Sequence, residues 1–376
     1  MTLDPLQGEE RLRVLFVHTR FPGQFARLAA ALVRRGHDVR ALTTADAGAE
    51  GGQRIDGIPL ALFDDPSAAP SAGLLAPLEA ALAGSSSVAV AAEALAGEGY
   101  RPDLVYAHAG WGAGCFLKDV FPTARVVKYF EWYFNNHDSD ADFGDPGRPL
   151  AARLATRLLD LPLLLEFASA DAAIVPTRFQ ADQFPALIRD RLEVVPDGVD
   201  TDWFAPDADA AFALPGGRRL TRADKVVTYV ARGADPYRGF RPFMLALAAL
   251  QARDADVEAV IAGDDRVHYG PGAGTDDHKR AVMAEAAVDP RRTHFVGRIP
   301  LKRYRRLLQV SAAHVHLSVP FVLSWSVLEA MACGCAIVGS MGMPLEEVLT
   351  HRRTALLAGF DDVDALAGHI AEARAG

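Results

Sequence analysis

Short strand-like runs alternate with longer helical patterns along almost the whole chain, and few folds can accommodate this alternation. Residues 12–18 (LRVLFVH) form the continuous apolar run of a buried strand, and Phe25 to Arg35 repeats apolar residues at helical spacing. Strands that alternate with helices in this way build a parallel sheet with helices on both faces. The sequence therefore predicts an α/β protein.

Two such series follow each other and are separated by an irregular segment rich in Pro, Gly and Asp. The length of 376 residues also suits two domains, because a single core stops growing before this size. We expect a first domain over residues 1–200 and a second over 201–376. Ligands bind beyond the carboxyl ends of strands in such sheets, so we expect a binding cleft between the domains. The predicted strands are 12–18, 37–42, 103–108, 125–130, 172–175 and 192–195, then 225–231, 256–262, 293–296, 313–318, 336–339 and 354–357.

Two further stretches of the first domain have a helical composition. Residues 67–97 are rich in Ala, Ser and Gly, and we expect loose, mobile helix and loop there. Residues 149–167 predict a helical run with Arg153 and Arg157 among many leucines. This pattern suits binding of a lipid or docking on a membrane surface, and ordinary core packing explains it equally well.

The composition excludes several classes of protein. Apolar residues make up 50% and charged residues 23%, so a disordered or fibrous chain is excluded. The formal net charge of −9 argues against nucleic acid as the main partner. The three cysteines form no C-x-x-C pair, which argues against a disulfide framework or structural zinc and suits a reducing compartment. Without a secretion-signal layout or a continuous apolar span of about 20 residues, we expect a cytoplasmic protein whose membrane contact is peripheral.

In the second domain, a Gly-rich turn carries two arginines. Arg232 and Arg238 lie between the predicted strand 225–231 and a helix that begins near Phe240. A guanidinium offers paired donors that match phosphate oxygens, and the free amides of a helix start add their dipole. The turn therefore suits a diphosphate, and two solvated loop arginines are the alternative.

A second helix start follows the predicted strand 313–318. Ser324 or Ser326 is expected to begin a helix that Gly334 ends, with first-turn amides available for an anion. Glu329 lies among apolar residues of this helix. A carboxylate in such surroundings needs a partner, and a ribose diol donates two hydrogen bonds at once. The alternative places Glu329 on the exposed face of the helix.

Polar residues also follow two strands predicted in the first domain. His108 and Glu131 are expected at neighbouring strand ends, where acid–base and hydrogen-bonding groups act. A core or capping role for His108 is equally open. Trp111, Trp132 and Tyr133 are candidates for stacking on a bound sugar, and burial in the core is the commoner outcome for such rings.

We predict neither a metal ion nor an organic cofactor. The aspartates of residues 138–142 and 264–265 are spaced closely enough to ligate Mg²⁺ or Mn²⁺, but the first group lies in a loop with turn composition. The glycines of residues 110–114 lack the G-x-G-x-x-G spacing of a dinucleotide-binding loop, and the chain has no Walker pattern.

On the donor side, these motifs resemble the retaining GT-B glycosyltransferases of family 4. The turn with Arg232 and Arg238 is similar to the family's Arg and Lys clamp on the donor diphosphate, with Arg238 in place of Lys. Glu329 and the Ala-Met-Ala-Cys-Gly after it resemble the second Glu of the family's paired-glutamate motif, which holds the donor ribose. His294 and Arg298, in the run HFVGR, match the strand end that reads the nucleobase.

The resemblance extends over nearly the whole chain. Gly23 and Gln24, in the run FPGQF, resemble the acceptor-side loop of the family, and residues 195–200 (VPDGVD) resemble its interdomain signature. His often occupies the position of His108 in these enzymes and touches the sugar or the acceptor.

One position departs from the family pattern. Phe321 stands eight residues before Glu329, where the family has the first Glu of the pair, and Val-Leu-Ser replaces the Gly-Phe-Gly that follows it. In the family that first Glu contacts hydroxyls of the donor sugar. Three readings follow: other groups such as Ser324, Ser326 or Trp325 hold the sugar, the donor is unusual, or activity is lost.

The resemblance implies a GT-B fold, in which two Rossmann-like, doubly wound parallel-sheet domains face a cleft. It implies retaining, metal-independent transfer of a sugar from a nucleoside-diphosphate sugar, with UDP or GDP as the expected carrier. The first domain would bind a small-molecule, glycan or lipid-linked acceptor and the second the donor. Arg232, Arg238, His108 and Glu131 would then be catalytic. The alternative is an inactive GT-B scaffold that binds a nucleotide or a partner protein.

Overall fold

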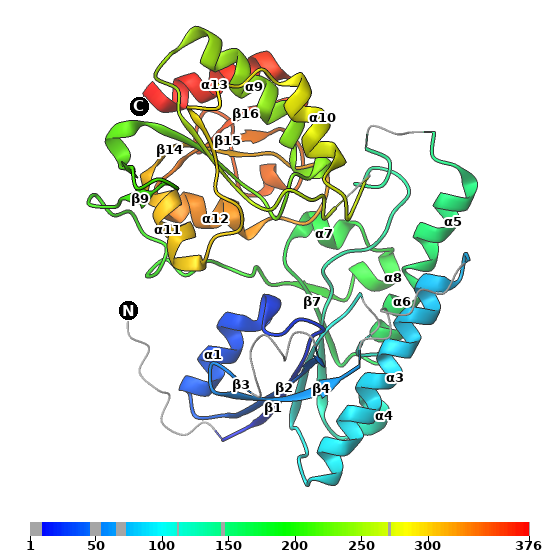
Figure 1. Ribbon diagram of the computed structural model, residues 1–376. Coiled ribbons are helices and arrows are strands. Elements are labelled where there is room, and N and C mark those ends of the chain that lie inside the picture. Colours follow the sequence, from blue (N-terminus) through cyan, green and yellow to red (C-terminus); the bar gives the residue numbers. More distant parts are fainter. Residues whose placement is uncertain are drawn as a thin grey trace. The chain divides into compact units, whose positions relative to one another are not determined.

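The chain forms two compact units, Met1–Asp197 and Gly198–Gly376 (Figure 1). The computed structural model describes residues 10–45, 54–64, 73–110, 113–143, 147–269 and 272–375. The division between the units falls inside the VPDGVD segment, close to the expected boundary at residue 200. Each unit has a largely parallel sheet with helices on its two faces, so the predicted α/β class is confirmed.

The first unit is built on an eight-stranded sheet in the order β3-β4-β2-β1-β5-β6-β7-β8. Its neighbouring strands are parallel except for β3 and β4, a short antiparallel pair that the sequence did not reveal. The order reverses between β1 and β5, and ligands bind at the carboxyl ends beside such a switch point. The strands are β1 (Arg13–Val17), β2 (Asp38–Thr44), β3 (Arg54–Ile55), β4 (Ile58–Phe63), β5 (Leu104–His108), β6 (Arg125–Tyr129), β7 (Ala172–Val175) and β8 (Leu192–Val194). The helices are η1 (Gly23–Phe25), α1 (Ala26–Arg34), α3 (Ala76–Gly97), α4 (Leu117–Val120), α5 (Leu150–Leu158), α6 (Leu161–Ala168), α7 (Arg178–Asp182) and α8 (Ala186–Arg189).

Helix α3 corrects the prediction of loose helix and loop over residues 67–97. Residues 76–97 form one continuous helix, because their many Ala and Leu residues favour helix. Val88, Ala92 and Leu95 pack in the core against the sheet. Residues 67–72 lie outside the described part of the chain. By length and composition α3 is the one helix among the described residues that is long and apolar enough to cross a membrane.

The helical run predicted over residues 149–167 is two helices, α5 and α6. The break falls at Leu159 and Asp160, and Pro162 lies in the first turn of α6. Proline is tolerated in a first turn but disrupts a helix interior, because it lacks the N–H that a continuous helix needs.

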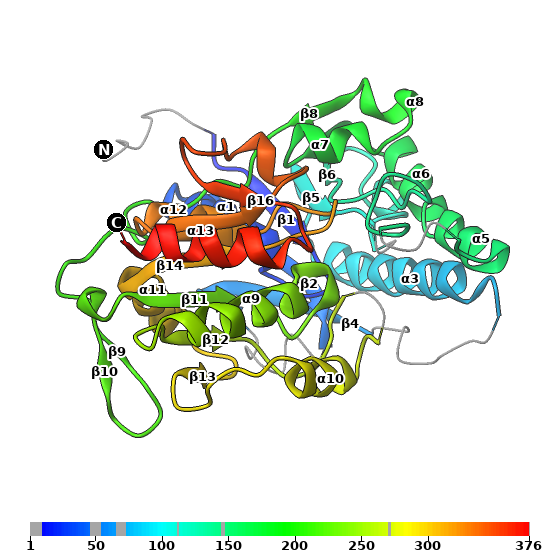
Figure 2. The ribbon, with the colours of Figure 1, turned by 90° about the horizontal axis from the view of Figure 1, so that it is seen from above.

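The second unit has a six-stranded, all-parallel sheet in the order β13-β12-β11-β14-β15-β16, the arrangement of a dinucleotide-binding fold. Helices α9 and α13 lie side by side on one face (Figure 2), and α11 and α12 pack on the other. The switch point lies between β11 and β14. The strands are β9 (Phe212–Ala213), β10 (Arg219–Leu220), β11 (Val226–Val230), β12 (Ala259–Ala262), β13 (Thr293–Phe295), β14 (Ser311–His316), β15 (Ala336–Ser340) and β16 (Leu356–Ala358). The helices are η3 (Arg222–Asp224), η4 (Pro236–Arg238), α9 (Phe240–Arg253), α10 (Asp277–Glu285), α11 (Leu301–Val310), α12 (Trp325–Ala332), η5 (Leu345–Glu347) and α13 (Val363–Ala375).

An ion pair buried in the first unit ties the loop after β5 to the sheet. Lys128 of β6 and Glu166 of α6 pair with each other, and neither side chain is exposed to solvent. The ammonium also donates to the carbonyl of Gly114 at 2.6 Å, and the Gly114 N–H donates to Glu166 at 2.8 Å. A Cβ at position 114 would lie 2.5 Å from the ammonium nitrogen, so only glycine fits there.

We expect Lys128→Met to lower the free energy of unfolding by about 3–5 kcal/mol, because it leaves a buried carboxylate without its cation. The double variant Lys128→Met, Glu166→Met should recover most of this loss, because an apolar pair of similar volume carries no uncompensated charge. Urea denaturation measures both. Lys118→Met, in a half-exposed pair with Asp171, is the control and should cost at most about 1 kcal/mol. A double variant no more stable than the single one would contradict this account.

Candidate functional site

The turn between β11 and α9 lies against the end of β14. Gly239 has φ +66°, and a Cβ there would lie 2.5 Å from the Cβ of Leu317. Glycine is required at this position because it accepts the left-handed conformation and allows the close approach. The Tyr229 hydroxyl donates to the carbonyl of Arg238 at 2.8 Å and holds the turn from the strand side.

Arg232 and Arg238 each lie beside an aromatic ring. The guanidinium carbon of Arg232 is 5.3 Å from the ring centroid of Tyr269, and that of Arg238 is 5.7 Å from the centroid of Phe321. The two rings are 5.8 Å apart. Arg238 also donates to Ser318 Oγ at 2.8 Å, so it is not simply a solvated loop residue. Both predicted diphosphate-binding residues therefore lie at the switch point of the sheet.

A buried carboxylate holds the loops that carry these side chains. Asp235 is fully buried, and its Oδ1 accepts the backbone N–H groups of His268 at 2.5 Å and Tyr269 at 2.9 Å. The N–H of Ala234 donates to the carbonyl of Arg266 at 3.2 Å. These bonds join the loop after β11 to the loop after β12 and fix the backbone of Tyr269.

Helix α12 begins at Trp325, as the serine pattern predicted. Ser324 is its N-cap residue, but its side chain makes no capping bond and its Oγ lies 2.9 Å from that of Ser326. Ser326 in turn lies 3.4 Å from Nδ1 of His316, at the end of β14.

Glu329 is buried on α12 rather than on its exposed face, so that alternative is wrong. Its side chain accepts a hydrogen bond of 2.8 Å from the hydroxyl of Tyr304 on α11. Burial, together with the charge of Glu329, raises the pKa of Tyr304 well above its usual value, so the phenol remains a donor. Contact between Glu329 and a ribose stays a prediction.

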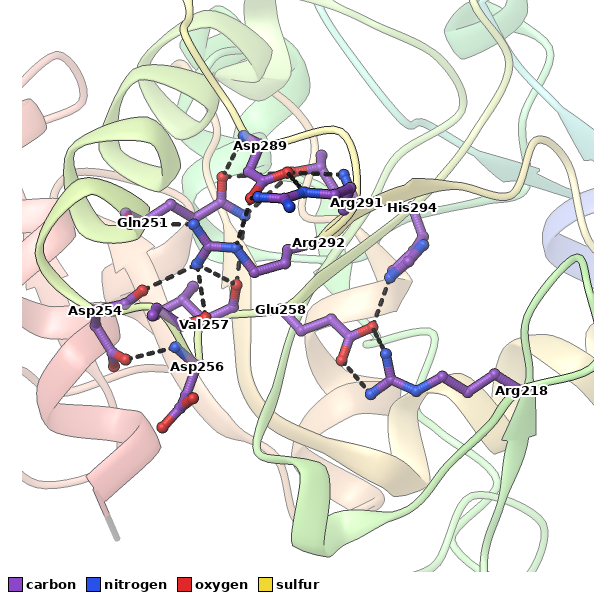
Figure 3. A network of polar contacts seen from close by, with 12 residues as sticks. Arg218, Gln251, Asp254, Asp256, Val257, Glu258, Asp289, Arg291, Arg292 and His294 are labelled. Carbon is purple, nitrogen blue, oxygen red and sulfur yellow. Dashed lines mark hydrogen bonds and ion pairs between the residues drawn. The ribbon is translucent and has the colours of Figure 1, made fainter.

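His294 takes part in a network at the edge of the sheet. Its Nε2 lies 2.6 Å from Glu258, whose carboxylate also accepts two hydrogen bonds, of 2.8 and 2.6 Å, from Arg218 (Figure 3). Arg218 belongs to the β9–β10 hairpin, so these contacts attach the hairpin to the sheet. Arg298 is exposed beyond the end of β13. Recognition of the base by His294 and Arg298 stays a prediction.

The second part of the network in Figure 3 supports the fold. Arg292 donates to the carbonyls of Asp254 and Ala255 at 3.0 Å each and to the carboxylate of Asp289 at 3.0 Å. Residues 254–257 precede β12, so these bonds lie at the amino end of the sheet. Arg232 and Arg238 lie at the opposite, carboxyl end.

At the carboxyl ends of β1, β5 and β6 in the first unit, four polar side chains form one network. Nε2 of His18 lies 2.8 Å from Oε1 of Gln24, and Nε2 of Gln24 donates to Glu131 at 2.7 Å. The other oxygen of Glu131 lies 3.5 Å from Nε2 of His108. Because Nδ1 of His18 accepts the N–H of Arg20 at 2.8 Å, the His18 proton lies on Nε2. The predicted Gln24, His108 and Glu131 are therefore brought together.

The sequence reasoning missed His18, although a usable signal was present. His18 ends the predicted strand 12–18, and the rule that singled out His108 and Glu131 applies to it equally. Gly23 lies directly against it: a Cβ at this position would be 2.5 Å from Nε2 of His18, and φ is +43°. Glycine therefore allows the FPGQF loop to close on the imidazole.

The network has defined charges. Burial and the neighbouring His108 lower the pKa of His18 to about 4, so His18 is neutral at pH 7. Burial by itself raises the pKa of Glu131. The contacts with His108 and the hydrogen bond from Gln24 lower it by more, so the pKa of Glu131 lies below its usual value. The ionised Glu131 can accept a hydrogen bond from a hydroxyl group of a ligand, whereas both ring nitrogens of the neutral His18 are already bonded, to Gln24 and to the N–H of Arg20.

Two further contacts at these strand ends did not follow from the sequence. The Tyr129 hydroxyl donates to the carboxylate of Asp197, with 3.1 Å to each oxygen. Nε2 of Gln180 donates to the carbonyl of Glu131 at 2.6 Å. The first contact anchors the start of the VPDGVD segment, and the second holds the backbone that presents the Glu131 carboxylate.

The first-unit aromatics that were candidates for stacking on a sugar are core residues where the structure describes them. Trp132 and Tyr133 are buried; Trp132 packs on Phe179, and Tyr133 packs on Phe184 with ring centroids 5.3 Å apart. Trp111 lies outside the described residues.

The acidic clusters have local partners. In the 138–142 loop, Asp142 accepts the N–H groups of Asp138 and Ser139, which is turn chemistry. Asp264 lies 2.8 Å from Nε2 of His268, and Asp265 pairs with Lys279 on α10. Within the described ranges, no three His, Cys, Asp or Glu side chains are grouped to hold a metal ion.

Comparison with protein families gives matches in both units. Residues 35–204 match a family model described as glycosyl transferase family 4 group, and residues 224–374 match one described as glycosyl transferases group 1. The D-inositol 3-phosphate glycosyltransferase of Mycobacteroides abscessus is 32% identical over 195 residues, which is 50% of this chain and 41% of the relative. The alpha-maltose-1-phosphate synthase of Mycolicibacterium smegmatis is 29% identical over 221 residues, 54% and 53% of the two chains. The matches thus span about half the length of these relatives.

Solved structures resemble the chain over nearly its whole length. Sucrose-phosphate synthase from Thermosynechococcus elongatus has a TM-score of 0.70 at 17% identity and covers 97% of this chain and 90% of its own. Anabaena HepE, solved in complex with UDP and glucose, has a TM-score of 0.63 at 17% identity. The match covers 97% of this chain and 94% of the HepE chain. At this level of identity the similarity concerns the fold.

The neutral, buried His18 predicts a pH dependence of stability. Its folded-state pKa of about 4 lies below the unfolded value of about 6.5, so the unfolded chain binds more protons between these pH values. This contribution is complete above pH 6.5 and is lost as the pH falls toward 4. The free energy of unfolding should fall between pH 7 and pH 5 in both proteins. We expect this fall to be about 2 kcal/mol smaller in His18→Gln than in the wild type.

Urea denaturation at the two pH values measures this difference. Other buried histidines add to the pH dependence in both proteins, so only the difference reports on His18. His137→Gln is the control, because that side chain is 77% exposed, and it should leave the dependence unchanged. An identical fall in the wild type and His18→Gln would contradict the assignment.

Proposed function

Because this chain belongs to glycosyltransferase family 4 and has the GT-B fold, we propose that it transfers a sugar from a nucleoside-diphosphate sugar to an acceptor hydroxyl. We further propose that transfer retains the anomeric configuration and needs no metal ion. The observation that carries the proposal is the pair of guanidiniums, Arg232 and Arg238, at the switch point of the second unit's sheet. Two fixed cations at this edge suit a diphosphate.

In the proposed step, the bond between C1 of the sugar and the phosphate oxygen breaks, and its electron pair leaves with the diphosphate. C1 forms a bond to the acceptor oxygen on the same face of the sugar, and the acceptor proton passes to the departing phosphate oxygen. Negative charge grows on the diphosphate during this step, so prepositioned guanidiniums lower the barrier. They also supply the positive charge that a metal ion provides in other phosphate sites.

We propose that the network of the first unit binds the acceptor. Gln24, Glu131 and His108 present donors and acceptors at adjoining strand ends. Glu131, ionised at neutral pH, can accept a hydrogen bond from a hydroxyl and keep the neighbouring imidazole oriented. His108 would contact the acceptor or the sugar directly.

For the donor we propose a UDP or GDP carrier, and the solved HepE complexes with UDP and with UDP-glucose support the former. The acceptor is proposed to be a small molecule, a glycan or a lipid-linked molecule. Leu150, Leu154 and Leu161, on α5 and α6, are between 42 and 61% exposed, and Arg153 lies among them. This surface supports a lipid-linked acceptor or peripheral membrane contact of a cytoplasmic enzyme.

Arg232→Ala and Arg238→Ala should each weaken binding of the nucleoside diphosphate by about 10- to 100-fold, because each removes charge-assisted hydrogen bonds. Turnover of the donor should fall by about 100-fold or more. Calorimetric titration with UDP, GDP and ADP and release of nucleotide from the matching sugars measure the two effects.

Arg241→Ala is the matched control, because Arg241 forms a surface pair with Glu285 on the side of α9 and should leave both values unchanged. Unchanged nucleotide affinity in both site variants would refute the role of the guanidiniums. Tight binding to the wild type, without turnover on any donor and acceptor, would favour the inactive scaffold instead.

Glu329→Gln tests the proposed ribose contact. The wild type should bind the ribonucleotide about 10- to 100-fold more tightly than its 2′,3′-dideoxy analogue, because a carboxylate accepts charge-assisted hydrogen bonds from the diol. The variant should lose most of this preference while it still binds the dideoxy nucleotide. If the preference persists in Glu329→Gln, another group holds the ribose.

A further inference from the structure

We propose that Tyr269 and Phe321 form an aromatic platform for the donor sugar, so that the site recognises the C–H surface of the sugar more than its hydroxyls. This inference rests on the proposed function. The platform is this ring pair, with centroids 5.8 Å apart and planes inclined at 55°. Both rings are half-buried at the carboxyl end of the sheet, Tyr269 after β12 and Phe321 after β14.

The platform lies at the proposed diphosphate site. Arg232 is beside Tyr269, and Arg238 is beside Phe321, with guanidinium-to-centroid distances of 5.3 and 5.7 Å. A diphosphate held by both guanidiniums is therefore next to both rings. The diphosphate links the ribose of the nucleoside to the sugar that is transferred. We have proposed that Glu329 holds the ribose, so the transferred sugar is the group that can reach the platform.

The platform is held firmly in place. Asp235 accepts the backbone N–H of Tyr269, and its carboxylate is completely buried, so movement of the loop would take hydrogen bonds away from a buried acceptor. Arg238, which donates to Ser318 Oγ at 2.8 Å, lies against the ring of Phe321. Rings fixed in advance bind a ligand at a smaller cost in conformational entropy than rings that must be ordered.

The chemistry of the platform determines what it can distinguish. Phe321 has no atom that can accept or donate a hydrogen bond, so a sugar hydroxyl facing it makes no bond that a deoxy sugar would lose. Sites that hydrogen-bond a hydroxyl reject analogues without it strongly, whereas apolar sites do so weakly. Among nearby polar groups, Ser318 accepts from Arg238 and donates to the carbonyl of Val319, both at 2.8 Å, so its proton is already used. The hydroxyls of Ser324 and Ser326 lie 2.9 Å apart and share one hydrogen bond. At Phe321 the platform therefore suits donors whose sugar presents an apolar or deoxygenated face.

The experiment compares the affinities of a nucleoside diphosphate and its sugar in the full chain. Titration with UDP, GDP and ADP first identifies the base. The glucose derivative on that base, and its 4-deoxy and 6-deoxy analogues, are then measured in the wild type, Phe321→Leu, Tyr269→Leu and Phe321→Gln. The measured quantity is the dissociation constant of each sugar nucleotide divided by that of the free diphosphate.

In the wild type, we expect the two deoxy donors to bind within about threefold of the glucose donor. Phe321→Leu and Tyr269→Leu should raise the ratio for all three sugars by about five- to tenfold, because stacking is lost, while affinity for the free diphosphate changes less than about twofold. Phe321→Gln should bind the glucose donor at least about fivefold more tightly than its deoxy analogues, because the amide bonds a hydroxyl. Phe360→Leu, at a half-buried phenylalanine after β16, is the control and should leave every ratio unchanged.

Each other outcome overturns the inference in a distinguishable way. Unchanged ratios in Phe321→Leu and Tyr269→Leu would show that the rings do not touch the sugar. Equal weakening of the free diphosphate and its sugars would show that the rings serve the nucleotide or the arginines instead. If the wild type binds no nucleoside diphosphate, the proposed function itself fails and the platform fails with it. Retained affinity for the free diphosphate shows that a variant is folded.

Discussion

The reversal of strand order beside the first strand of each parallel sheet is the constraint on which the rest of the structure depends. Where neighbouring strands are followed by helices on opposite faces, the loops at their carboxyl ends separate and leave room for a ligand. In the second unit this reversal lies between β11 and β14, so the turn with Arg232 and Arg238 meets the loop with Ser318 and Phe321. In the first unit it lies between β1 and β5, which brings His18 and His108 together.

Both sets of strand-end residues depend on a carboxylate that makes hydrogen bonds to neighbouring residues. Asp235 is buried between the loops after β11 and β12 and holds the backbone of Tyr269, and Glu131 joins Gln24 to His108. These groups cost free energy to bury, and that cost is recovered only while their hydrogen bonds are made. Such a group therefore restricts the positions of neighbouring functional side chains more strongly than apolar packing does. Lys128 and Glu166 have the same effect on the loop after β5.

The sequence was enough to predict the fold class, twelve of the strands and the main polar candidates. The spacing of apolar residues and the position of a residue at the end of a strand are local properties of the chain. It did not reveal the short pairs β3–β4 and β9–β10. It also suggested loose structure where α3 is continuous, because the Ser and Gly residues there obscured a good helical composition. Glu329 illustrates the limit for the site. Its spacing showed that it lies in a helix, but only packing against Tyr304 decided which face it occupies.

By itself the sequence determined which residues lie at strand ends and helix starts, because the spacing of apolar residues and the composition of turns are local features of the sequence. These local patterns are enough to place Arg232, Arg238, His108 and Glu131 at the carboxyl ends of strands. Only the tertiary structure decided which of these side chains meet, because contacts between distant segments depend on strand order and loop packing. That is why Tyr269, from the loop after β12, emerges as the neighbour of Phe321 only in three dimensions.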